Sequence, residues 1–361
     1  MNVNDYKFVK NSNVAFVHEL RNRVNKYFSD NNISKYGNFT MYFKTVCMIT
    51  FFVTPYALMI SGVISNPYLV LLSWILMGIG MAGIGLSVMH DANHGAYSPN
   101  KTVNKWMSYI IFLVGGNQDN WLMQHNRLHH TFTNVEGLDV DIDSVPLLRF
   151  SPHKELKSYH KNQYIFAWFL YGLLTVSWMT IKDFGQLYKF REMGLITSQK
   201  QFNQLMTKCI LGKLFYYIYI IVLPLIFINA SAWVIVLGIF LMNFVAGVIL
   251  STIFQLAHVM PETAFPLPNE DHDIENNWAV HQLFTTANFA PKNKILSWYC
   301  GGLNFQVEHH LFPQICHIHY NKLSPIIAKT AAEYNIPYFS ESTFRQALGS
   351  HITMLKKLGT A

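Results

Sequence analysis

Two long stretches without any charged residue constrain this chain more than any other feature. No Asp, Glu, Lys or Arg occurs in the 46 residues from Thr45 to His90, or in the 48 residues from Leu214 to Pro261. A membrane-spanning helix needs about 20 apolar residues, so each stretch is long enough for two spans. Helices of this length in soluble proteins keep a polar face, which makes buried soluble core helices the poorer interpretation.

Each charge-free stretch has a short polar break at its middle, which predicts a helical hairpin. The breaks are Ser65-Asn66-Pro67 and Asn229-Ala230-Ser231. The predicted fold is therefore an all-α integral membrane protein with four transmembrane helices in two hairpins, at approximately 43–64, 68–89, 210–228 and 232–256. Charged residues make up 13% of the chain, against about 25% in an average soluble domain, which agrees with this fold class.

The placement of basic residues predicts the orientation. Neither hairpin turn contains Lys or Arg, and all 27 basic residues lie in the N-terminal stretch, in the region 90–213, at span edges or after the second charge-free stretch. The positive-inside rule places these regions and both termini in the cytoplasm. The net charge of +7 is then a bias towards anionic lipid, and no nucleic-acid partner is expected. We expect a cytoplasmic N-terminal segment at 1–40, without a signal peptide, and one membrane domain at 41–361.

Histidine is the second unusual feature, with 16 residues concentrated in three groups. The groups are His90-Asp91-Ala92-Asn93-His94, His125-Asn126-Arg127-Leu128-His129-His130 and Gln306-Val307-Glu308-His309-His310. Histidines four residues apart share one face of a helix, so that both imidazoles reach a single metal ion. Imidazole suits iron, zinc or copper, and seven histidines exceed what one tetrahedral zinc uses. The sequence therefore predicts a two-metal site.

A shared metal site requires the three groups to lie on one membrane face. Two spans separate the second group from the third, which returns the chain to the same side. The apolar run 162–181 is also 20 residues long, but a crossing there would place the third group on the opposite side. We therefore expect 162–181 to be an interfacial helix. The same parity brings His258 out at the cytoplasmic end of the fourth span, where it is a candidate further metal ligand.

These motifs, with their separations and two hairpins, resemble the three histidine boxes of the membrane fatty acid desaturases, from about residue 40 to the C-terminus. The glutamine that opens the third box resembles the front-end acyl desaturase branch, as do Asn120-Trp121, Thr133-Asn134, Asp139-Val140-Asp141, His309-His310-Leu311-Phe312-Pro313 and His319-Tyr320.

The resemblance implies a mushroom-shaped fold whose cytoplasmic helical cap holds a His-rich di-iron site. It implies that the catalytic, metal-binding histidines are His90, His94, His125, His129, His130, His309 and His310, with His258 as the extra ligand. Many relatives have histidine where this chain has Gln306. Three roles therefore stay open for Gln306: weak metal binding, binding through water, or orientation of a neighbour.

The function implied is a dioxygen-dependent desaturase that introduces a double bond into a fatty acyl chain linked to CoA or to a lipid. No His-Pro-Gly-Gly haem motif occurs in the sequence, so we expect a separate electron donor, either a ferredoxin or cytochrome b5 with its reductase. An acyl-chain hydroxylase of the same histidine-box class is the alternative. A membrane metal transporter is less favoured, because the spans contain almost no ionisable ligands.

Further polar residues lie near the boxes in the sequence. Neutral imidazoles leave metal charge uncancelled, so neighbouring carboxylates are candidates to support the ligands, although helix caps and loops are equally common roles. These are Asp91, Glu136, Asp139, Asp141 and Glu308. Arg127, Lys182 and Arg191 are candidates to meet a phosphate or CoA head group, although solvated charge is the commoner role. His281, His317 and His319 are expected to be structural or to support the ligands.

Overall fold

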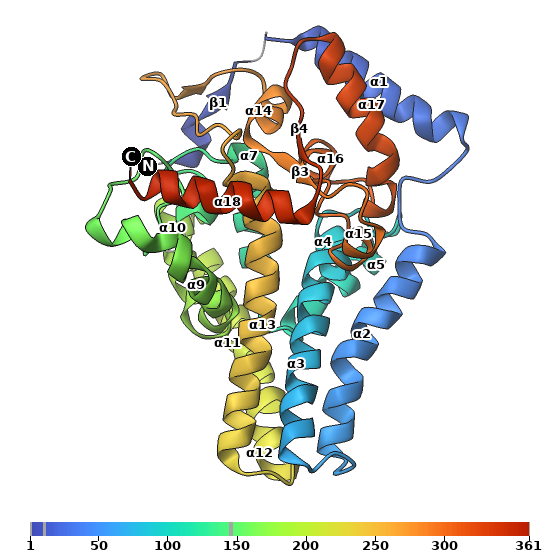
Figure 1. Ribbon diagram of the computed structural model, residues 1–361, viewed down its shortest axis with the longest axis vertical. Helices are drawn as coiled ribbons and strands as arrows, with labels where there is room; N and C mark the ends of the chain where they lie inside the picture. The colour runs from blue at the N-terminus through green and yellow to red at the C-terminus, as the bar shows by residue number, and fades with distance from the viewer. Residues whose placement is uncertain (1, 10–11, 144–146, 361) are drawn as a thin grey trace.

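The computed structural model describes residues 2–9, 12–143 and 147–360, and it is mostly helical (Figure 1). Two short parallel strand pairs add to the helical fold that the sequence predicts. Strand β1 (Lys7–Phe8) pairs with β2 (Asp273–Ile274), and β3 (Ala287–Phe289) pairs with β4 (Phe339–Glu341). The second pair joins the region before the third histidine group to the region after it.

The four helices expected to span the membrane are all present, with their ends displaced by up to 11 residues. Each is long and apolar enough to cross a bilayer, at Phe39–Ile60, Pro67–Asn93, Gln199–Phe227 and Ala232–His258. The first and last are α2 and α13. The second comprises α3 (Pro67–Gly83), η2 (Ile84–Met89) and α4 (His90–Asn93). The third comprises α11 (Gln199–Tyr217), η7 (Ile218–Val222) and α12 (Leu223–Phe227).

Each polar break separates the two helices of a hairpin, because its residues cap the start of the second helix. The side chain of Asn66 accepts hydrogen bonds from the backbone N–H groups of Tyr68 and Leu69 at 3.0 and 3.4 Å, which satisfies two N–H groups at the start of α3. Pro67 occupies the first helical turn, where its missing N–H is not needed. In the second hairpin, Ser231 stands at the N-cap of α13.

A fifth helix of sufficient length and apolarity occurs within the described residues, at Ser158–Glu192. It comprises η5 (Ser158–Asn162), α9 (Gln163–Ser177), η6 (Trp178–Lys182) and α10 (Asp183–Glu192). Helix α9 runs antiparallel to α13, and the backbones meet closely where Gly172 faces Gly247. Ser251 donates a hydrogen bond to the carbonyl of Tyr171 at 3.3 Å. Length and hydropathy alone thus give five candidate spans, one more than predicted.

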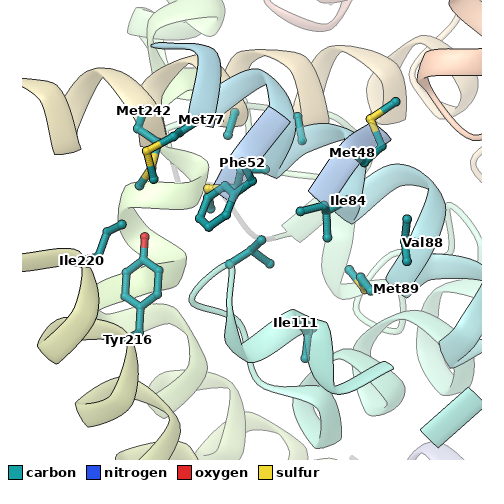
Figure 2. Close-up of a cluster of buried hydrophobic side chains, with 14 of the residues drawn as sticks. Met48, Phe52, Met77, Ile84, Val88, Met89, Ile111, Tyr216, Ile220 and Met242 are labelled. Carbon is teal, nitrogen blue, oxygen red and sulfur yellow. The ribbon is translucent and has the colours of Figure 1, made fainter. Parts of the chain in front are cut away.

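The membrane helices enclose a core rich in methionine and aromatic residues. Figure 2 shows Met48 and Phe52 of α2, Met77 of α3, Tyr216 of α11 and Met242 of α13 within this cluster. The opposite faces of the same helices carry large exposed apolar side chains, including Phe43, Phe51, Leu211, Phe215 and Trp233. Apolar surface of this extent on long helices is typical of lipid contact, so the chain is a multi-pass membrane protein.

The short helices gather at one end of the long ones, and both ends of the described chain lie at that end as well (Figure 1). Helix α1 (Val14–Asp30) packs through Phe16, Leu20 and Val24 in one hydrophobic cluster with α17 (Tyr320–Glu333). The remaining elements are η1 (Val3–Asp5), α1 (Val14–Asp30), α5 (Lys101–Ser108), η3 (Tyr109–Phe112), α6 (Gln118–Trp121), η4 (Leu122–His129), α7 (His130–Phe132), α8 (Val140–Asp143), α14 (Trp278–Thr285), α15 (Lys294–Tyr299), α16 (Gln306–Leu311), η8 (His317–His319), α17 (Tyr320–Glu333) and α18 (Phe344–Leu358).

Candidate metal centre

Four segments that are distant in sequence bring the histidine groups together. The first group continues from the membrane helix α3 into α4, the second lies on η4 and α7, and the third lies on α16. His258 is the last residue of α13. Two of these elements contain π-helical turns, at Ile84–Met89 and Leu122–His129. Such turns are rare and occur frequently at functional sites, because they alter which side chains face inward.

One set of imidazoles consists of His90, His94, His125 and His309, whose ligand nitrogens all lie within 4.8 Å of one another. The Nε2 atom of His125 lies 3.2 Å from Nε2 of His90 and 3.2 Å from Nε2 of His130. A ring nitrogen has one lone pair or one N–H in the ring plane, so it cannot form good hydrogen bonds to both neighbours. Convergence of this kind suits a shared cation.

A second set consists of His129, His258 and His310, with ligand nitrogens again within 4.8 Å of one another. The ring centroid of His258 lies 4.7 Å from that of His129 and 4.8 Å from that of His310. A ring nitrogen of His130 also lies within 4.8 Å of ring nitrogens of His309 and His310. His309 belongs to the first set and His310 to the second, so His130 lies between the two sets. All seven box histidines and His258 therefore meet in one place. Their arrangement in two sets agrees with the two-metal site that the sequence predicts.

The outer nitrogens of four histidines are held by hydrogen bonds. His129 Nδ1 lies 3.1 Å from Asp139 Oδ2, and His310 Nδ1 donates to Gln282 Oε1 at 2.8 Å. His258 Nδ1 donates to the carbonyl of Thr285 at 3.3 Å, and His309 Nδ1 lies 3.3 Å from the hydroxyl of Tyr320. These contacts fix the ring orientations and leave each Nε2 pointing away from its partner.

The Nε2 atoms of these same four histidines are buried and have no hydrogen-bond partner among the described residues. His94 Nε2 is also buried and without a hydrogen-bond partner among the described residues. Unpaired buried polar atoms cost free energy, and so many in one place call for a ligand that is not protein. The type, the number and the burial of these imidazole nitrogens therefore all fit a metal site.

The electrostatics favour neutral imidazoles, the form that binds metal. Burial, with the neighbouring imidazoles, lowers the pKa of His94, His125, His130, His309 and His310 well below the usual value. His129 differs: burial alone lowers its pKa, but the charge and hydrogen bond of Asp139 outweigh burial and raise it. A carboxylate that holds Nδ1–H in this way leaves Nε2 available and increases the basicity of the ligand.

The carboxylates singled out in the sequence have different partners. Asp139 contacts His129, and Asp141 Oδ2 lies 3.8 Å from the same Nδ1. Asp91 accepts a hydrogen bond from His317 at 2.8 Å, and its Oδ1 lies 3.9 Å from His90 Nδ1. Glu308 accepts from Asn288 and Tyr338 at 2.8 and 2.6 Å. Among the five carboxylates expected near the site, Asp139 makes the most direct contact with a box histidine.

Sequence reasoning did not find Gln282, Thr285 and Tyr320 as partners of the histidines. Gln282 and Thr285 lie on α14, which carries none of the box histidines, and the Thr285 contact uses a backbone carbonyl, which has no side-chain signature. The sequence pattern singles out Tyr320 only as part of the pair His319-Tyr320. Gln306 is 3% exposed and lies on α16, three residues before His309.

Comparison with known proteins identifies the family. The sequence matches the fatty acid desaturase family over residues 65–342. It is 35% identical to a protein named sn-1 linoleoyl-lipid 6-desaturase from Arthrospira platensis, over 96% of this chain and 93% of the relative. This chain belongs to the fatty acid desaturase family. A Synechocystis protein of the same name is also 35% identical, over 96% of each chain. The acyl-lipid (8-3)-desaturase of Physcomitrium patens is 34% identical, over 96% of this chain and 72% of the relative.

The desaturase is therefore an oxidoreductase of lipid metabolism, and the resemblance seen in the sequence is confirmed. Three of its box histidines border a cavity that is partly open to the outside. Residues of η2, α9 and α13 form most of the walls, and His90, His125 and His309 border the cavity together with Trp121 and Gln306. A mostly apolar cavity that passes a set of metal-ligating side chains suits a long hydrocarbon substrate.

Proposed function

We propose that this desaturase introduces a double bond into an acyl chain carried by a membrane lipid. It uses two irons held by its histidines, dioxygen as co-substrate and electrons from a separate donor. The observation that carries the proposal is the convergence of unpaired Nε2 atoms beside an apolar cavity. The names of the relatives support a lipid-linked acyl substrate, because all three described above are lipid desaturases.

In this proposal, His90, His94, His125, His129, His130, His258, His309 and His310 hold the metal ions. The two sets of imidazoles support two sites, with His130 between them. Imidazole is a suitable ligand for iron, and geometry together with ligand type decides selectivity. Gln306 stays a prediction as a weak or water-mediated ligand; its place on the cavity wall beside His309 supports a role close to the site.

The bound irons supply activation of dioxygen, which is the chemistry needed to remove hydrogen from unactivated methylene groups. The residues of this chain supply the rest. Four of the histidines keep their Nε2 atoms directed at the site because their Nδ1 atoms are bound elsewhere: His129, His258, His309 and His310. Asp139 compensates positive charge through His129. The apolar walls exclude water and hold the acyl chain extended next to the histidines.

We further propose a four-span topology in which α9 lies in the membrane interface and the histidine cap faces the cytoplasm. Both ends of the fifth helix support this. Gln163, at its start, hydrogen-bonds to Arg149 and to the carbonyl of Leu355. Asp183, towards its other end, accepts from Asn120, which lies five residues before the second box. Both ends thus contact the region of the short helices, as expected for a helix that does not cross.

The electron donor in this proposal is a ferredoxin or cytochrome b5 with its reductase. The division into a segment at 1–40 and a membrane domain at 41–361 stays a prediction.

The proposal is tested by expression in a host that lacks the activity, followed by mapping of double bonds in each lipid class. We expect the acyl chains to lose two hydrogens for each new double bond, which is a mass decrease of about two units. His129→Ala is expected to abolish the product, because it removes a ligand of the second set. An exposed histidine, His18, provides the matched control His18→Ala. A gain of oxygen would instead identify a hydroxylase, and unchanged activity in His129→Ala would contradict the metal-centre account.

A further inference from the structure

The cavity beside the histidines is apolar over most of its wall but contains one opposed pair of charges. Among the described residues that line it, Lys182 is the one Lys or Arg side chain, and Asp141 is the one carboxylate. The two side chains attract each other electrostatically. A charged group in a mostly apolar wall is unfavourable unless it is paired or binds a ligand. Asp141 supplies part of that pairing.

The polar end of the cavity lies next to the candidate metal centre. Asp141 Oδ2 lies 3.8 Å from His129 Nδ1. Gln124, which directly precedes His125, donates a hydrogen bond to Asp141 and accepts one from Gln186. This chain of contacts connects the second histidine box to the helix that carries Lys182. A ligand group held by Lys182 is therefore close to the histidines.

The local structure of the helix also singles out Lys182. Leu170, Leu174, Trp178 and Lys182 are four residues apart and line the cavity in one stripe. Lys182 ends the π-helical turn Trp178–Lys182. Comparable turns immediately precede His90 and contain His125 and His129. Three of the segments that border the cavity thus share a rare backbone conformation that is frequent at functional sites.

We propose that Lys182 binds the carbonyl oxygen at the carboxyl end of the acyl chain and thereby sets the distance from that end to the new double bond. This rests on the proposed function. The ammonium group has three N–H donors, and Asp141 attracts it only through the electrostatic field, so its donors are available for a carbonyl oxygen. The apolar stripe of Leu170, Leu174 and Trp178 then accommodates hydrocarbon. Because Gln186, one helical turn after Lys182, contacts Gln124 beside His125, the carbonyl end of the acyl chain lies near the second histidine box.

The carbonyl is common to lipid esters and CoA thioesters, and the experiment supplies each substrate separately. Lys182→Met keeps most of the side-chain volume and removes the donors, and Lys182→Arg keeps the charge and donors. Lys200→Met removes an exposed lysine and is the matched control. We expect Lys182→Met to raise KM about 10-fold for the substrate form, ester or thioester, that the enzyme uses. This is the effect of losing one hydrogen bond to a charged group. It also broadens the position of the double bond counted from the carboxyl end.

A binding measurement on metal-free protein separates this role from catalysis. The probes are two lipids of equal chain length, one ester-linked and one ether-linked, since the ether lacks the carbonyl. Wild-type protein is expected to prefer the ester by about 10-fold. Lys182→Met is expected to lose the preference, and Lys182→Arg and Lys200→Met to keep it. The wild-type preference needs no variant, so it remains informative if Lys182→Met does not fold.

Equal binding of ester and ether by wild-type protein would overturn the proposal. So would a Lys182→Met enzyme with unchanged KM and unchanged double-bond position. Loss of bound iron in Lys182→Met with a retained ester preference would show that Lys182 supports the metal site instead, which also overturns it. In each of these outcomes wild-type protein still forms a double bond, whereas failure of the proposed function shows as no double bond in wild-type lipids.

Discussion

Replacement of Asp139 by asparagine tests the link between the buried carboxylates and the metal site. Asp139 accepts three hydrogen bonds: from His129 Nδ1 at 3.1 Å, from the backbone N–H of Asn134 at 2.9 Å and from the backbone N–H of Asp141 at 3.0 Å. Both Asp139 oxygens are used, with Oδ2 accepting two bonds and Oδ1 one. Asparagine has only one acceptor oxygen, so one of the N–H groups must face an NH₂ group.

Two losses follow, and each has an expected size. One hydrogen bond to a charged acceptor is lost, which lowers the free energy of unfolding by about 1.5–3 kcal/mol. The negative charge behind His129 is also lost, which weakens the basicity of its Nε2. Removal of a partner of this kind weakens metal binding by about 10- to 100-fold.

The assay titrates metal-free protein with ferrous iron against a competing chelator under anaerobic conditions. Asp119→Asn is the control, because Asp119 is a partly exposed carboxylate that pairs with Lys208 at 3.1 Å and contacts none of the histidines. We expect weaker iron binding in Asp139→Asn and wild-type binding in Asp119→Asn. Iron affinity in Asp139→Asn equal to wild type would falsify the view that this carboxylate acts through His129.

Three further predictions concern stability. Chelation of iron is expected to lower the temperature of unfolding by several degrees, with recovery on re-addition, because the metal binds only the folded protein. Gly247→Ala is expected to destabilise by about 1–3 kcal/mol, since its Cβ would lie 2.6 Å from the carbonyls of Gly172 and Tyr171. Gly185→Ala, which meets nothing within 4 Å, is expected to be neutral or stabilising, and equal denaturation midpoints for the two variants would contradict this. Burial lowers the pKa of His281 and His351 to about 4, so the unfolded chain binds more protons between pH 4 and 6.5. Metal-free protein should therefore be less stable at pH 5 than at pH 7 in denaturant titrations; equal stability would refute this.

The sequence predicted those parts of the molecule that depend on local pattern. Charge-free length and the breaks at residues 65–67 and 229–231 place the four long helices, because spanning length and chain reversal are properties of a continuous segment. The spacing within each histidine group predicts which rings share a helix face. The requirement for one metal site, together with span parity, brought His258 into the set although it lies in none of the boxes.

Other features depend on contacts that no local pattern encodes. Gln282 reaches His310 from α14, and Thr285 uses a backbone carbonyl, so neither has a spacing signal. The parallel pair β3–β4 has three residues in each strand and joins segments about 50 residues apart, too short for an alternating pattern. The helix at 158–192 has both the length of a span and contacts at both ends with the short helices. Hydropathy therefore does not decide its path.

The iron content of purified protein tests the central claim most directly. If the eight histidines form one two-metal centre, metal analysis gives two irons per wild-type chain. His258→Ala is then expected to bind less than two, because it removes a ligand of the second set. Active wild-type protein with no iron, or with a single iron that His258→Ala leaves unchanged, would contradict the two-metal centre.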